Sequence, residues 1–135
     1  MKWFVVLVTI LVFGLAFWVW FKPKPVATAP LESKIINLGK VEISATPEKV
    51  KVGESLVFKL ALTTHSVELN YDFTQVIAAG DDRGNSYPAV NWSGGSGGHH
   101  LEGEITFDRL KPGARQLKLI FTDIDQKGGE LSWEL

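Results

Sequence analysis

The chain of 135 residues carries 14 basic and 15 acidic side chains, a formal net charge of −1, and this length gives room for one small domain. Residues 1–30 contain three lysines and no acid, so 11 basic and 15 acidic side chains remain from residue 31 onward, a charge of about −4. That mild acidity argues against a nucleic-acid partner, which needs a basic face, and the lack of cysteine excludes disulfides and thiolate metal sites.

The first element is an apolar run over residues 3–21, WFVVLVTILVFGLAFWVWF, with no charge and one hydroxyl. A helix of 19 residues measures about 28 Å, close to the thickness of the hydrocarbon layer, and aromatic residues at both ends suit the headgroup regions. We therefore predict a transmembrane helix over residues 1–21 that contacts membrane lipid through residues 3–21. A helix buried inside the domain is less favoured, because the chain is too short to surround it.

A cleavable signal peptide is the stronger alternative, but the apolar run exceeds the usual ~7–15 residues, and Pro30 is a poor residue to follow a cleavage site at Ala27-Thr28-Ala29. Lys22 and Lys24 follow the run and only Lys2 precedes it, which by the positive-inside rule favours a cytoplasmic domain. Against that count, Met-Lys, an immediate apolar run and a Pro/Ala spacer resemble a prokaryotic signal anchor. The resemblance implies a single-pass protein of the cell membrane with its domain outside the cytoplasm.

A spacer follows the apolar run. Residues 22–30 read KPKPVATAP, and three prolines in nine residues with small neighbours neither form a helix nor bury surface. We expect an extended stalk over residues 22–34.

The remaining sequence, residues 35–135, alternates between apolar and polar residues in short stretches separated by Gly, Pro, Asn and Asp, which predicts antiparallel strands with one buried face. Residues 50–52 form at most a short edge segment. Asp81-Asp82-Arg83-Gly84-Asn85 has the composition of a hairpin turn. The expected strands cover residues 41–43, 56–62, 67–73, 76–77, 87–92, 101–107, 117–121 and 131–135.

Seven or eight short strands at this spacing predict an all-β immunoglobulin-like sandwich, with a small barrel as the alternative. The run of Gly-Glu-Ser before a strand, paired strands around an Asp-rich turn and Gly-Asn-Ser-Tyr-Pro after it resembles extracytoplasmic immunoglobulin-like domains of prokaryotes. The resemblance covers about residues 40–135. It implies a fold and a location but hardly a function, because sandwiches carry many unrelated activities.

Three histidines provide the candidate site. In an immunoglobulin-like sheet, the strand near residues 55–64 pairs antiparallel with the strand that starts near His100, which brings His65 and His99-His100 to one edge. By parity His65, His100 and Glu102 point outward, where two imidazoles and a carboxylate suit Zn(II) or Cu(II). His99 is the fourth candidate ligand, although by the same count it points inward, which suits a hydrogen-bonded structural residue better. The alternative is that all four are polar loop and strand-edge residues without a ligand.

Small copper-resistance sandwiches are similar in size and fold class, which favours the metal hypothesis, although Met1 as the single methionine excludes a thioether Cu(I) site. Two further groups of oxygen ligands could bind calcium, although turn chemistry explains both: Asp81, Asp82 and Asn85, and Asp123 with Asp125. Trp92 and Trp133 are more consistent with core positions than with a binding surface.

An enzyme is hard to support from the sequence. His65 and Ser66 are adjacent, so on a strand they point to opposite faces and do not form a nucleophile-base pair. The sequence therefore predicts a membrane-tethered, non-catalytic module that binds an unknown protein or small ligand, with a metal-binding protein of the cell envelope as the alternative.

Overall fold

Alternation of apolar and polar residues produces nine β-strands in residues 30–135, the part of the chain that the computed structural model describes. The elements in chain order are β1 (Lys34–Leu38), β2 (Val41–Lys49), β3 (Ser55–Thr63), the short helix α2 (Phe73–Val76), β4 (Ile77–Asp81), β5 (Ser86–Tyr87), β6 (Ala89–Trp92), β7 (His100–Arg109), β8 (Gln116–Ile124) and β9 (Lys127–Glu134). The predicted membrane anchor over residues 1–21 lies outside the described residues, as does the stalk up to residue 29. Within residues 30–135, none of the helices has the length and apolar character needed to cross a membrane.

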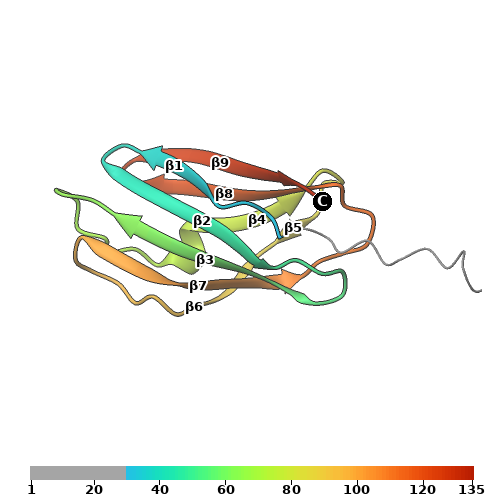
Figure 1. Ribbon diagram of the computed structural model, residues 1–135. Helices are drawn as coiled ribbons and strands as arrows, with labels where there is room; N and C mark the ends of the chain where they lie inside the picture. The colour runs from blue at the N-terminus through green and yellow to red at the C-terminus, as the bar shows by residue number, and fades with distance from the viewer. Residues whose placement is uncertain (1–29) are drawn as a thin grey trace, which may run out of the picture.

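The strands form two antiparallel sheets that pack face to face (Figure 1). One sheet has the order β1-β2-β3-β7-β6 and the other the order β5-β4-β8-β9. The prediction of an all-β sandwich is therefore confirmed, and the small barrel is excluded because the two sheets remain separate ladders.

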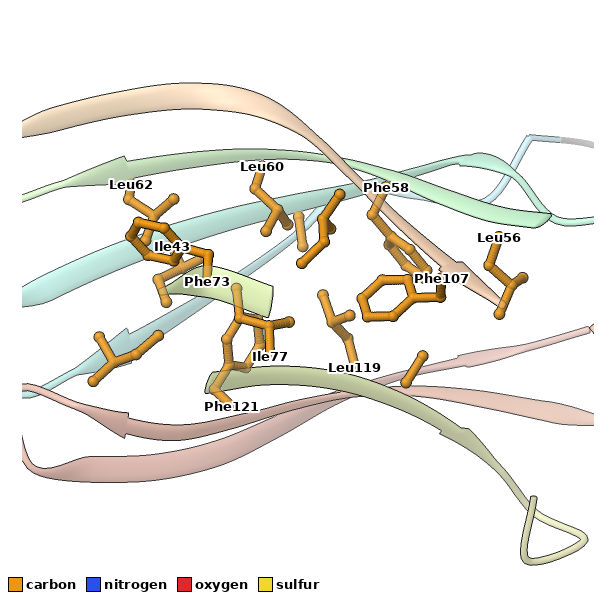
Figure 2. Packing of buried hydrophobic residues seen from close by; sticks show 14 of the residues in the cluster. Ile43, Leu56, Phe58, Leu60, Leu62, Phe73, Ile77, Phe107, Leu119 and Phe121 are labelled. Carbon is orange, nitrogen blue, oxygen red and sulfur yellow. The ribbon is translucent and has the colours of Figure 1, made fainter. Parts of the chain in front are cut away.

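The core fills the space between the sheets, as Figure 2 shows for side chains that point inward from both layers. The even-numbered residues Leu56, Phe58, Leu60 and Leu62 of β3 and the odd-numbered Leu101, Ile105 and Phe107 of β7 are buried, as their parity predicts. Trp133 is 2% exposed and its ring lies 5.3 Å from that of Phe58, which confirms it as a core residue.

The sandwich is closed on one side by contacts of β9 with β1 and with the residues just before β1, where the edge strands of the two sheets meet. The Lys34 Nζ atom donates to the Ser132 carbonyl at 2.7 Å, and the Trp133 indole N–H donates to the Glu32 carbonyl at 2.7 Å. These bonds join segments about one hundred residues apart in sequence.

Residues 67–73 are not the strand that their two-residue period predicts. Residues 64–72 have no regular structure apart from bends, and α2 begins at Phe73. Asp72 caps this helix, since its carboxylate accepts a hydrogen bond from the Thr74 backbone N–H at 3.1 Å. Leu69 and Phe73 are buried all the same, so the period reflects packing against the core and not pairing in a ladder.

The predicted strand over residues 87–92 is split at Pro88. β5 pairs with β4 in one sheet, as the predicted hairpin requires, whereas β6 pairs with β7 in the other. Proline has no backbone N–H to donate to a ladder, so the chain leaves the first sheet at this residue and enters the second. Residues 50–52 lie in the turn between β2 and β3, and β1 is an additional strand.

The turns and loops gather at two opposite ends of the sandwich (Figure 1). We call one the Pro30 end, because Pro30 lies there beside the turns at residues 50–54 and 110–115. The turn at residues 82–85 belongs to the same end, since Asp82 is bonded to Arg115 and Gln116. The other is the histidine end, formed by the turns at residues 39–40 and 125–126 and the loops at residues 64–72 and 93–99. β3 runs from the Pro30 end to the histidine end, and β7 runs back.

Candidate functional site

The pairing of β3 with β7 places the three histidines at one end of the sandwich, as predicted. Thr63 pairs with His100 in the register, and the Thr64 N–H donates to the His99 carbonyl at 3.0 Å. His65 follows the end of β3 by two residues. The ladder between β3 and β7 therefore brings residue 65 and residues 99–100 to the same edge of the sheet.

The side chains of the four predicted residues are exposed, which confirms the outward orientation of His65, His100 and Glu102 and corrects that of His99. Parity fails for His99 because β7 begins only at His100. The residue before the strand belongs to the loop, whose backbone does not follow the pleat, so its imidazole faces solvent.

The four predicted ligands do not form a metal site. In residues 30–135 no three His, Asp or Glu side chains gather closely enough to hold an ion. The His100 Nδ1 atom lies 3.1 Å from the Thr63 hydroxyl, and His65 lines a shallow depression of about 300 Å³ with residues of the β1–β2 turn.

Glu102 is occupied by a neighbour on β3. Its carboxylate lies 2.9 Å from the Lys59 Nζ atom, and this hydrogen bond and charge lower the pKa of Glu102 and raise that of Lys59. Both side chains are half exposed, so the pair contributes little to stability. It nevertheless turns the carboxylate toward a lysine, and the geometry does not support Zn(II) or Cu(II) binding by these residues.

The Gly/Ser-rich loop at residues 93–98 is held by hydrogen bonds. The Leu69 N–H donates to the Gly98 carbonyl, the Gly97 N–H donates to the Leu69 carbonyl, and the Gly98 N–H donates to the Glu68 carboxylate at 2.6 Å. The loop at residues 93–99 and the loop at residues 64–72 thus form one surface.

Close packing explains why glycine occupies two positions at the base of this loop. A Cβ atom on Gly103 of β7 would lie 2.5 Å from the backbone of Gly94, and one on Gly94 would lie 2.1 Å from the indole of Trp92. The Trp92 N–H in turn donates to the Gly95 carbonyl at 2.7 Å. Close packing of loop on strand therefore accounts for Gly94 and Gly103.

Asp81 is a buried acid at the Pro30 end that serves the β4–β5 turn. It is 8% exposed, and its carboxylate accepts hydrogen bonds from the N–H groups of Arg83 and Asn85, the Asn85 side-chain amide and the Tyr87 hydroxyl. Burial by itself raises the pKa of Asp81, but the hydrogen bonds outweigh it and hold the pKa at about 2.

The neighbouring Asp82 joins this turn to another. Its carboxylate accepts from the N–H groups of Arg115 and Gln116, which lowers its pKa. At the opposite end, Asp125 accepts from the Lys40 N–H at 2.8 Å. Turn chemistry thus accounts for these carboxylates, in agreement with the alternative to calcium binding.

A further feature, which sequence reasoning missed, is an apolar groove of about 560 Å³ at the Pro30 end. Its apolar lining comes from four separate stretches of the chain, and two of its members, Val52 and Leu135, are 54% and 45% exposed. The available signal was the sequence Lys49-Val50-Lys51-Val52, where apolar residues in a turn have no strand partner to cover them. The groove is lined by Pro30, Leu31, Pro47, Glu48, Val50, Val52, Leu110, Ala114, Glu134 and Leu135.

Comparisons with known proteins identify no relative: no family model, no curated protein and no solved structure matches this chain.

Proposed function

We propose that this chain is a membrane-tethered, non-catalytic binding or interaction module with an immunoglobulin-like fold, held outside the cytoplasm. The observation that carries the proposal is the position of Pro30, at the end of the sandwich opposite the loops at residues 64–72 and 93–99. An anchor over residues 1–21 would hold the Pro30 end toward the membrane. The histidine end would then be the surface presented to a partner.

The strand order supports the immunoglobulin-like assignment. Immunoglobulin domains of the constant type place strands A, B, E and D in one sheet and C, F and G in the other. With β2 as the first strand, the order β2-β3-β7-β6 opposite β4-β8-β9 reproduces this arrangement. β1 and the two-residue β5 are additions at the edges.

The environment of the polar side chains supports a non-catalytic role. The lowered pKa of Asp81 arises from hydrogen bonds that fix a turn. The lowered pKa of Glu102 and the raised pKa of Lys59 arise from their solvent-exposed pair. These shifts have structural causes. His65 and Ser66 are exposed neighbours in a loop.

The histidine end has the features of a binding surface for an unknown protein or small ligand. Its two loops are joined by backbone hydrogen bonds between Leu69 and residues 97–98. The Ser96 hydroxyl also bonds to the Asn70 side chain at 3.0 Å. Rigid loops at one end of a sandwich lose little entropy on binding, as in the binding loops of antibodies.

The test is topology. Because the chain has no cysteine, Ser66→Cys introduces one label site in an exposed loop of the histidine end. In intact spheroplasts we expect an impermeant maleimide to label this variant in the membrane fraction, and added protease to remove the domain. Full protection from both reagents until the cells are lysed would place the domain in the cytoplasm. Recovery in the soluble fraction would refute the tether.

A further inference from the structure

We infer that the Pro30 end is a membrane-docking surface, which seats the apolar groove and the surrounding basic side chains on an anionic bilayer. The inference rests on the proposed tether and adds an orientation to it. The domain is upright, with its long axis perpendicular to the membrane and its Pro30 end at the bilayer surface. Figure 1 shows the β2–β3 turn, the β7–β8 loop and the β4–β5 turn together at this end.

The first step is the reach of the tether. Eight residues, 22–29, separate the predicted anchor from Pro30, and eight fully extended residues span at most about 29 Å. β3 alone has nine residues, which corresponds to about 30 Å along the sandwich. The Pro30 end can therefore reach the bilayer surface, whereas the histidine end is held at least one strand length further away in the upright orientation.

The second step is the chemistry of the tip. Val50 and Val52 alternate with the exposed Lys49 and Lys51 in the β2–β3 turn, and Val52 is 54% exposed. Exposed apolar side chains between lysines suit the boundary between headgroups and acyl chains, because the ammonium groups reach the phosphates while the valines leave water. Leu135 and Pro30 extend the same apolar surface across the groove.

The third step is the distribution of charge. Residues 31–135 are acidic as a whole, but this end carries six exposed basic side chains against six exposed acidic ones, and the Asp82 carboxylate among the latter is occupied by two backbone N–H groups. The histidine end carries two basic residues, Lys40 and Lys127, against Glu42, Glu68, Asp72, Asp123 and Asp125. An anionic surface therefore repels the histidine end, which is acidic, more strongly than the Pro30 end, where the two signs balance. The six basic residues are Lys49, Lys51, Arg83, Arg109, Lys111 and Arg115.

Weak contacts suffice for such a surface. The anchor converts docking into an intramolecular step, with an effective concentration in the millimolar range for a short linker. A few apolar side chains and lysines, too weak to bind a membrane alone, can then set the orientation of the domain.

The experiment uses the full chain in vesicles of phosphatidylcholine with phosphatidylglycerol. Val52→Cys and Ser66→Cys each give a single site for a fluorescent label, one at each end of the sandwich. A nitroxide quencher attached to lipid headgroups should quench the label at position 52 and leave the label at position 66 nearly unchanged. Vesicles of phosphatidylcholine alone should reduce the quenching at position 52.

Charge variants sharpen the test. Each lysine near an anionic surface changes the docked-to-undocked ratio about fivefold, so Lys49→Gln with Lys51→Gln should strongly reduce quenching at position 52. The matched control, Lys40→Gln with Lys127→Gln, removes the same charge from the histidine end and should leave quenching at position 52 intact or increase it.

The possible failures are distinguishable. If the chain does not float with the vesicles, the tether fails and the docking surface fails with it. If the chain floats and neither label is quenched, the tether stands and the docking surface is refuted. Equal strong quenching of both labels would mean that the domain lies on its side, and would also overturn the inference.

Discussion

At the scale of single residues, Asp81 has a large structural role for a small buried side chain. Its carboxylate satisfies two backbone N–H groups and two side-chain donors, and the same Tyr87 hydroxyl that donates to it accepts from the Lys111 N–H at 3.2 Å. The acid therefore connects the β4–β5 turn to the loop after β7. Burial and the bond to Asp81 raise the pKa of Tyr87, which keeps the phenol a donor.

The first prediction concerns pH. The folded-state pKa of Asp81 is about 2, below its ordinary value of 3.8, so its contribution to stability is present above about pH 4 and is lost as the pH falls through 2. The contribution corresponds to about 2 kcal/mol. We expect Asp81→Asn to lower the free energy of unfolding by about that amount at pH 7, with the difference from wild type shrinking between pH 4 and 2.

Urea denaturation at a series of pH values measures this difference. The control is Asp82→Asn, which changes a neighbouring acid that also accepts backbone hydrogen bonds but is exposed to solvent; its effect should be smaller. Parallel curves of stability against pH for wild type and Asp81→Asn would contradict the assigned role of the carboxylate.

At the scale of elements, strands with one buried face were predictable and loops that bury side chains were not. β3, β7 and β8 alternate strictly enough that parity assigned their buried residues correctly. The segment at residues 64–72 has the same alternation because Val67, Leu69 and Tyr71 pack against the core, yet its backbone bonds go to the loop at residues 93–99. The Asp72 cap of α2 was the overlooked local signal.

The second prediction concerns the closure of the sandwich by β1 and β9. Trp133→Phe removes the N–H bonded to the Glu32 carbonyl and leaves a cavity in the core beside Phe58. We expect a loss of about 2–3 kcal/mol in the free energy of unfolding.

Trp92→Phe is the matched control for this variant, because its N–H also donates to a backbone carbonyl at 2.7 Å but the ring is only partly buried. Its loss should be clearly smaller in the same urea titration. Equal losses for the two variants would argue that the hydrogen bond, and not burial between β1 and β9, accounts for the effect.

At the scale of the whole molecule, the two ends of the sandwich differ in charge and in surface. The Pro30 end carries the apolar groove and most of the basic turns, and the histidine end carries acids and the hydrogen-bonded loops. Both proposals depend on this polarity, since a tether at one end leaves the other free for a partner.

The third prediction is that residues 31–135 fold without the anchor. Twenty-two buried apolar residues form one continuous core between the sheets, and a core of this extent supports a domain of about 100 residues without disulfides. We expect the fragment to be soluble, with a far-ultraviolet circular dichroism spectrum dominated by strand and one cooperative thermal transition. A strongly helical spectrum, or insolubility without the anchor, would refute the independence of the domain.

The sequence by itself determined the all-β class and which residues of the long strands are buried, because both follow from a two-residue period. It also determined that residue 65 and residues 99–100 meet at one edge, because the strands beside them pair antiparallel. It also identified the core position of Trp133. Tertiary structure alone decided the rest. Contacts between residues distant in the chain decide three features that no local pattern predicts. They decide whether the chain changes sheets at Pro88, whether His99 belongs to a strand, and whether another side chain covers Val52. The histidines share an end of the molecule for a reason visible in the sequence. Within residues 30–135 they form no metal site, because the His100 imidazole lies beside the Thr63 hydroxyl, His65 lines a depression with the β1–β2 turn, and Glu102 pairs with Lys59.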